Sequence, residues 1–208
     1  NKHIAIWEGE KLTKENTTKI SGISNVEWTD SFEKIFDKLE KKSKHIYINT
    51  NEHYRAKVET QTREDRFINW CKDKYPNKNY LKSNFILQRL RSIKSDDEIN
   101  QIKHACSITE KGFRRVLNFI KPNVWEYEIE AEYAHEFLKN KSKGFAYQPI
   151  IASGTNNNVL HYVKNDKQCK KGDLILMDVG AEYGNYSSDM TRTCLLYTSP
   201  SPRDTNES

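Results

Sequence analysis

The chain has 208 residues, of which 36% are hydrophobic and 30% are charged, and its formal net charge is +5. This composition fits a polar globular protein with a buried core and excludes an intrinsically disordered chain. The lysines are interleaved with acidic residues and no run of about 18 apolar residues occurs, so we expect neither a nucleic-acid partner nor a membrane span.

The cysteines show neither the spacing of zinc ligands nor that of a disulfide framework. They stand alone at four positions: Cys71, Cys106, Cys169 and Cys194. No signal-peptide pattern opens the chain. We therefore expect a reducing, cytoplasmic location.

The first half of the chain is predicted to be a small α/β unit. Runs rich in β-branched and aromatic residues predict strands at 3–7 and 45–48. Between them, Asp30 and Glu33 have capping-box spacing and precede apolar residues at helical period, which predicts a helix.

A second helix is expected around Trp70, ending before Pro76. The polar stretch 74–83 that follows is rich in turn-forming residues and is predicted to be a linker.

The second half is predicted to begin with two helices. Ser95 and Glu98 form a capping box, and apolar residues then recur at steps of three and four as far as Ile120. Gly112 lies within this stripe, where glycine costs about 1 kcal/mol relative to alanine, so it indicates close packing. The second helix is expected over residues 126–140. Its apolar face is formed by Ile129, Tyr133 and Phe137.

After Gly144 the apolar period changes to two, which predicts strands at 147–151 and 159–163 and then a hairpin over 173–193. Two helices followed by antiparallel strands predict an α+β fold in which the helices cover one face of a sheet.

The hairpin carries one aspartate on each strand. If Tyr183 and Gly184 form a two-residue loop, Glu182 pairs with Asn185, and Asp178 and Asp189 then face each other. Facing side chains lie about 4.5–5.5 Å apart at Cβ, where like charges are destabilising. Such a pair calls for a cation or a shared proton, and we favour a metal site.

The alternative is a pair of surface aspartates near a turn. Leu174 and Leu176 share the face of Asp178 and are expected to be buried, which argues against that alternative. A buried, unpaired carboxylate would cost several kcal/mol or shift its pKa upward.

His161 lies in the predicted strand 159–163, and the pattern alone favours a hydrogen-bonded core histidine. The turn-rich stretch 153–158 before it leaves a second interpretation open, in which His161 lies at a strand mouth as a proton donor or carbonyl polariser. His104 and His135 lie on predicted helices and are expected to face solvent.

Several segments, in their order and spacing, resemble the first half of the catalytic domain of aminopeptidase P, in the creatinase, prolidase and methionine-aminopeptidase superfamily. They are residues 90–99, 151–154, 160–162, 178–183 and 188–193. Residues before about 85 are similar, more weakly, to the end of the family's N-terminal creatinase-like domain.

The resemblance implies a pita-bread catalytic fold with two divalent metal ions, usually manganese. By family motif, Asp178 and Asp189 are metal ligands, His161 contacts the substrate and the transition state, and Tyr147 is a substrate-binding pocket residue. The implied reaction is hydrolysis of the bond between an N-terminal residue and a following proline. The implied partners are peptides with proline in second position and, in the full-length parent, further copies of the same chain.

This sequence departs from the family pattern because the family's remaining ligands, one histidine and two glutamates, come later than Thr193. We therefore expect a fragment, cut at both ends and inactive as given. A prolidase-type dipeptidase and a non-catalytic peptide-binding pita-bread module remain alternatives. A non-catalytic module typically loses the two aspartates, which are present here.

These observations predict a partial N-terminal domain at 1–83 and a partial catalytic domain at 84–193. The segment 194–208 breaks the preceding patterns and resembles the translation of an adapter used to prepare DNA libraries. We predict that it is not native, the alternative being a natural tail rich in serine and proline.

Overall fold

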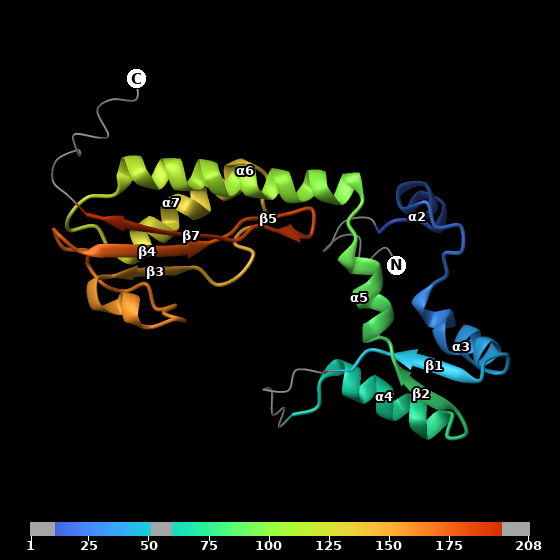
Figure 1. Cartoon of the computed structure of the whole chain (residues 1–208). Coiled ribbons are helices and arrows are strands. Elements are labelled where there is room, and N and C mark those ends of the chain that lie inside the picture. The colour runs from blue at the N-terminus through green and yellow to red at the C-terminus, as the bar shows by residue number, and fades with distance from the viewer. Residues whose placement is uncertain (1–10, 51–59, 197–208) are drawn as a thin grey trace. The chain divides into compact units, whose positions relative to one another are not determined.

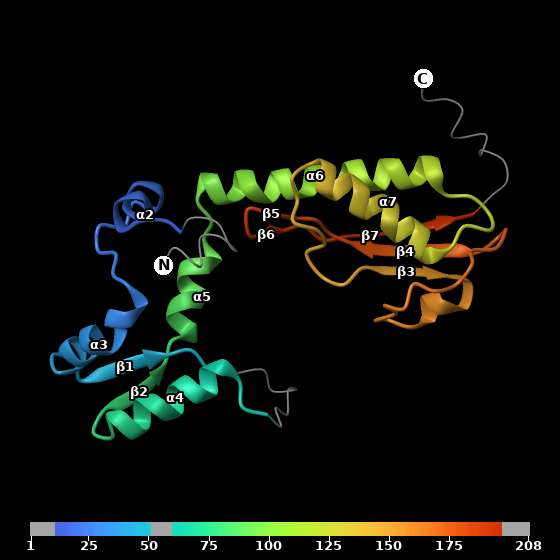
Figure 2. The ribbon, with the colours of Figure 1, turned by 180° about the vertical axis from the view of Figure 1, so that it is seen from behind.

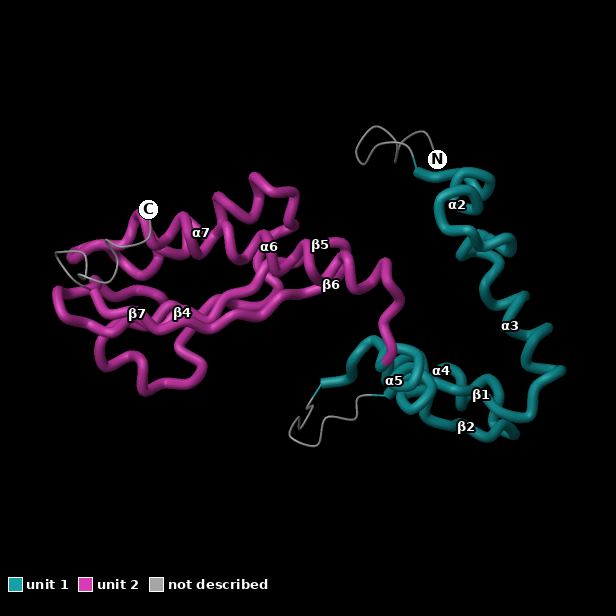
Figure 3. Tube along the Cα trace, turned by 45° about the horizontal axis from the view of Figure 1, so that its top comes forward, with its two compact units in different colours: residues 1–92 teal, residues 93–208 magenta. Residues whose placement is uncertain are grey.

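The computed structural model describes residues 11–50 and 60–196, and the chain divides into two compact units between Ser92 and Ile93 (Figure 3). The strand predicted at 3–7 lies outside the described residues. The predicted domain limits at residues 83 and 193 stay predictions, because a division by contacts need not follow a division by family. Among the described helices, none is long and apolar enough to cross a membrane.

The first unit is an α/β unit built around a pair of parallel strands, as the sequence predicts. Its described elements are α2 (Lys14–Ser21), η1 (Thr29–Ser31), α3 (Phe32–Glu40), β1 (His45–Ile48), α4 (Arg63–Lys74), β2 (Asn79–Lys82) and α5 (Asn84–Ser92). The strand at 45–48 and the helix that ends before Pro76 are confirmed.

Two predictions for this unit are wrong. The supposed linker contains β2, which pairs with β1, and the Tyr80 hydroxyl donates to the carbonyl oxygens of Cys71 and Tyr75 at 2.7 and 3.1 Å. Tertiary pairing therefore orders a stretch whose composition is typical of a loop. The capping box at Asp30 is absent, because α3 begins only after the short helix η1 and its N-cap, Ser31, makes no side-chain cap bond.

The second unit has two helices on one face of an antiparallel sheet, so the predicted α+β arrangement is confirmed (Figures 1 and 2). Its described elements are α6 (Asp96–Phe119), α7 (Glu126–Lys139), β3 (Ile150–Ser153), η2 (Gly154–Asn158), β4 (Leu174–Val179), β5 (Glu182–Tyr183), β6 (Tyr186–Ser187) and β7 (Met190–Leu195). The strand order of the sheet is β3-β4-β7, and β5 and β6 form a separate hairpin.

The long helix α6 begins at the predicted capping box. The Ser95 hydroxyl accepts from the Glu98 amide at 3.3 Å, and the Glu98 carboxylate accepts from the Ser95 amide at 2.7 Å. Gly112 on this helix packs closely, as predicted. A Cβ added there would lie 2.8 Å from Cε1 of Phe137 and 2.9 Å from Cδ1 of Tyr133.

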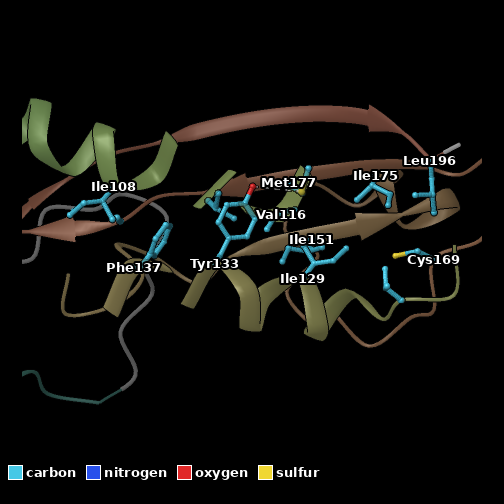
Figure 4. Close-up of a cluster of buried hydrophobic side chains, with 13 residues drawn as sticks. Ile108, Val116, Ile129, Tyr133, Phe137, Ile151, Cys169, Ile175, Met177 and Leu196 are labelled. Carbon is cyan, nitrogen blue, oxygen red and sulfur yellow. Dashed lines mark hydrogen bonds between the residues drawn. The ribbon is translucent and has the colours of Figure 1, made fainter. Parts of the chain in front are cut away.

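The core of the second unit lies between the two helices and the sheet (Figure 4). Helix α7 contributes its predicted apolar face, all of it fully buried. Strand β4 contributes Ile175, Met177 and Val179, which alternate along the strand and are also fully buried. Since each large apolar side chain stabilises by about 1.5–3 kcal/mol when buried, this layer supplies most of the energy that holds the sheet to the helices.

The strand predicted at 147–151 forms later, as β3, and overlaps the prediction only at Ile150 and Ile151, and no strand forms at 159–163. That second prediction is wrong: after β3 the chain makes the short helix η2 and a turn, and then runs irregularly to β4. Beyond Thr193, β7 continues through Leu195, and Leu196 is buried in the core. The native or non-native origin of segment 194–208 stays a prediction.

Candidate functional site

The hairpin that joins β5 and β6 turns at Gly184 and Asn185, one residue later than predicted. Both residues have positive φ, 59° and 67°, which a type I′ two-residue turn requires at its two central positions. The predicted loop would instead have placed Tyr183 in this left-handed region, which is unfavourable for a bulky residue. The turn chemistry therefore decides the register.

With this register, Asp178 lies opposite Thr191 and not opposite Asp189, so the predicted direct pairing is wrong. The shift is by two residues, and a two-residue shift keeps a side chain on the same face of a strand. Asp189, which immediately precedes β7, is therefore a diagonal neighbour of Asp178 on one face of the sheet.

The Tyr147 hydroxyl connects the two carboxylates. It lies 2.6 Å from Oδ1 of Asp178 and 3.0 Å from Oδ1 of Asp189, so both carboxylates are within reach of one hydroxyl group. Burial, followed by the hydrogen bond to Asp178, raises the pKa of Tyr147 well above its usual value. A phenol carries a single proton, so it cannot fully satisfy two negative charges.

His161, which sequence reasoning placed in a strand, lies in a turn and is exposed. The interpretation as a core histidine is therefore wrong. Its side chain helps to line a pocket of about 510 Å³. The residues that line this pocket are Tyr147, Gln148, Ile150, His161, Val163, Asp178 and Asp189. The structure thus brings all four sequence-predicted site residues together. Their roles stay predictions.

Asp178 lies on the less buried face of β4, contrary to expectation. Leu174 is 50% exposed and Leu176 is partly buried, whereas Ile175 between them points into the core under the helices. The expected burial of these two leucines is therefore wrong. Asp178 is half-buried at the pocket and its charge is accessible from solvent.

The backbone next to Asp178 holds Tyr147 in place. The Ala146 amide donates to the Gly180 carbonyl at 2.8 Å. A Cβ on Gly180 would collide with the Ser188 carbonyl oxygen and would lie 3.0 Å from Cε1 of Tyr147. Glycine at this position therefore allows three segments of the site to meet.

Asp189 follows a buried hydroxyl pair that sequence reasoning missed. Oγ of Ser188 lies 2.6 Å from Oγ1 of Thr109, and the Ala181 amide donates to both oxygens at 2.9 Å. This network ties the chain just before Asp189 to helix α6. Only the polar character of Thr109 within an otherwise apolar stripe could have indicated it.

The arrangement suits a divalent cation in part. Two carboxylates on one face, joined through one phenol, offer oxygen ligands and an excess of negative charge. Across residues 11–50 and 60–196, no group of three or more His, Cys, Asp or Glu side chains is close enough to hold a metal ion. His161 thus shares the pocket without completing a ligand cluster.

Comparison with known families gives the chain its context. Residues 100–207, more than half of the chain, match the model described as metallopeptidase family M24. The chain belongs to metallopeptidase family M24. Residues 1–47 match the model of the aminopeptidase P N-terminal domain.

Relatives of this M24 chain include Xaa-Pro peptidases. The Xaa-Pro aminopeptidase of Haemophilus influenzae is 40% identical over 108 residues, which cover 52% of this chain and 25% of that protein. The Xaa-Pro dipeptidase of Pyrococcus horikoshii is 35% identical over 130 residues, which cover 62% of this chain and 37% of that protein.

A solved structure described as an aminopeptidase P from Bacillus anthracis is similar over 98% of this chain and 49% of its own, with a TM-score of 0.87 and 33% identity. The chain thus spans about half of that structure and a smaller share of the curated relatives. These matches confirm the expected fold, an aminopeptidase P-like N-terminal domain followed by part of the M24 pita-bread domain.

Proposed function

We propose that the complete protein is a metal-dependent aminopeptidase that hydrolyses the bond between an N-terminal residue and a following proline. The observation that carries this proposal is the pocket in which Asp178, Asp189, Tyr147 and His161 meet. Membership of a metallopeptidase family and the activities for which the two relatives are named support it.

In this proposal, Asp178 and Asp189 are ligands of two divalent ions, with manganese as the metal. Their position on one face, reached by a single hydroxyl, supports a shared site. When bound, the ions would supply a Lewis acid for the scissile carbonyl and lower the pKa of a bound water. Among the described residues, no third His, Cys, Asp or Glu side chain joins the two aspartates, so the 208-residue chain itself is expected to bind manganese weakly and to be inactive.

Tyr147 and His161 orient the reactants in this proposal. Tyr147 stays protonated because its pKa is raised. Its hydroxyl donates a hydrogen bond to Asp178, which fixes the orientation of that carboxylate. His161 is exposed on the pocket wall, where its ring reaches a bound peptide and donates to the carbonyl that is being attacked.

The test uses the full-length protein that contains this chain, supplied with Mn²⁺. We expect it to release the N-terminal residue from a tripeptide with proline in second position. Asp178→Asn should lower kcat/KM by more than about 100-fold, because loss of an outer-shell partner alone costs 10–100-fold. Glu110→Gln, which changes an exposed carboxylate on α6, is the matched control and should leave the rate unchanged.

The same assay separates the alternatives. Cleavage of an Xaa-Pro dipeptide without cleavage of the tripeptide would assign a prolidase-type dipeptidase, which the Pyrococcus relative favours. Binding of the peptides without cleavage, unaltered by Asp178→Asn, would assign a non-catalytic peptide-binding module and overturn the proposal.

A further inference from the structure

Glu126, the first residue of helix α7, is a carboxylate with no exposed surface. Burial of a carboxylate costs several kcal/mol unless hydrogen bonds replace its water shell. Glu126 does not line the pocket that holds His161. Its partners therefore indicate what this buried charge is for.

One oxygen of Glu126 holds the beginning of the segment that carries His161. Oε1 accepts from the amide and from the hydroxyl of Ser153, both at 2.7 Å, and from Nδ2 of Asn156 at 3.3 Å. Ser153 is the last residue of β3, and Asn156 lies in η2. These bonds fix the point at which the chain leaves the sheet.

The other oxygen holds the middle and the end of the same segment. Oε2 accepts from the Tyr162 hydroxyl at 2.7 Å and from the Lys167 amide at 2.9 Å. The Glu126 amide in turn donates to the Lys167 carbonyl at 2.9 Å. One side chain thus fastens both ends of segment 153–167 and a point within it.

The residue that Glu126 holds within this segment, Tyr162, is the neighbour of His161. The Tyr162 ring is 8% exposed and packs with Ile150 and Ala152, and its hydroxyl also lies 3.1 Å from Oδ1 of Asp166. Burial and the bond to Glu126 raise the pKa of Tyr162, so it remains a donor at neutral pH.

The His161 ring makes no hydrogen bond within the part of the chain that the structure describes. Its orientation therefore depends on the backbone that Tyr162 anchors.

A second carboxylate on α7, Glu130, contacts the same segment differently. It accepts one bond, from Nδ2 of Asn165 at 2.8 Å, and a glutamine carbonyl could replace it in that bond.

We propose that Glu126 is a positioning residue for His161, acting through the Tyr162 hydroxyl and the closure of segment 153–167. This inference rests on the proposed function, since the orientation of His161 affects catalysis only if the pocket is an active site. The link from Glu126 to His161 can be tested without any catalytic assay.

The test records the ring NMR signals of the histidines in the 208-residue chain, with the His161 signal assigned from His161→Gln. The decisive variant is Tyr162→Phe, which removes one hydroxyl and keeps the buried ring. Glu126→Gln removes an acceptor from the segment, and Glu130→Gln is the matched control. His104 and His135, on helices α6 and α7, report whether the unit remains folded.

We expect Tyr162→Phe and Glu126→Gln to shift or broaden the His161 signal, while the signals of His104 and His135 stay in place. Glu130→Gln should change none of the three. An unmoved His161 signal in Tyr162→Phe would overturn the inference, and so would an equal change of all three histidines. If Glu126→Gln fails to fold, Tyr162→Phe alone decides.

A second measurement links the position of His161 to catalysis in the full-length protein with Mn²⁺. Misplacement of a catalytic group by about 1 Å can cost 100-fold, so Tyr162→Phe should lower kcat by about 10–100-fold with a smaller change in KM. Full activity of Tyr162→Phe beside a moved His161 signal would overturn the positioning role. Lack of activity in the unsubstituted protein would count against the proposed function. The link from Glu126 to His161 would then be decided by the NMR measurement alone.

Discussion

The two faces of strand β4 show how one six-residue segment serves both packing and chemistry. On one face Ile175, Met177 and Val179 are fully buried under the helices. On the other face Leu174 is half exposed, and Asp178 lines the pocket with Asp189. The larger cluster of buried side chains lies on the helix-covered face, and only a small one, around Tyr162, lies on the other. The stability of this unit therefore depends mainly on the helix-covered face, and the pocket face can carry charge.

The largest expected effect falls on the helix-covered face. Phe137→Ala removes a fully buried ring and should lower the free energy of unfolding by about 3–5 kcal/mol. Asp178→Asn is the matched change on the pocket face. It should change the free energy of unfolding by no more than about 1 kcal/mol, because that site is solvent-accessible. Urea denaturation followed by circular dichroism measures both. Equal losses would contradict the division of roles between the faces.

Gly112→Ala should give the next largest effect. The added methyl group would meet the rings of Tyr133 and Phe137 at less than 3 Å, and overpacking of this kind costs about 1–3 kcal/mol. Cys106→Ala, at an exposed position of the same helix, is the control and should change stability by less than about 0.5 kcal/mol. If Gly112→Ala were stabilising, as expected for helix propensity alone, close packing at this point would be disproved.

On the pocket face, Tyr147→Phe should change the pH dependence more than the stability at pH 7. The pKa of Tyr147 in the folded state lies above its unfolded value of about 10. The contribution of Tyr147 to the free energy of unfolding is therefore fully present below pH 10 and is lost as the pH rises toward the folded-state pKa. Between pH 8 and 11 the melting temperature should therefore fall more steeply with pH in the unsubstituted chain than in Tyr147→Phe. Parallel curves would show that Tyr147 ionises as it does in water.

The smallest perturbation is thiol labelling, which changes no contact in the folded state. Cys169 is fully buried in the helix-covered core, and burial raises its pKa to about 11, whereas Cys106 is exposed. A thiol reagent at pH 8 should therefore modify Cys106 rapidly and Cys169 only after unfolding. Rapid labelling of Cys169 in the folded chain would show that the core around it opens.

The helices of the second unit could be predicted from sequence because each carries its own local signals. The capping box at Ser95 and the apolar face of α7 need no knowledge of the rest of the fold. Strand β2 could not be predicted, since its four residues become a strand only by pairing with β1.

Sequence patterns predicted which residues form the candidate site but not how these residues are arranged. The face shared by Asp178 and Asp189 follows from strand period, whereas their register depends on which two residues turn the hairpin. Val159 and Val163 gave segment 159–163 the composition of a strand. Two side chains far away in sequence hold this part of the chain as a loop: Glu126 accepts from Tyr162 within the segment, and Glu130 accepts from Asn165 just after it. No local sequence pattern indicates these hydrogen bonds.

A Mn²⁺ titration of the 208-residue chain, followed by paramagnetic broadening of its amide NMR signals, tests whether Asp178 and Asp189 share one site for divalent ions. Signals next to both aspartates should broaden at the same Mn²⁺ concentrations, and Asp178→Asn should suppress the broadening at both. Asp37→Asn, in the other unit, should leave the broadening unchanged. Broadening at only one of the two aspartates, or broadening that persists in Asp178→Asn, would show that they do not share a metal site.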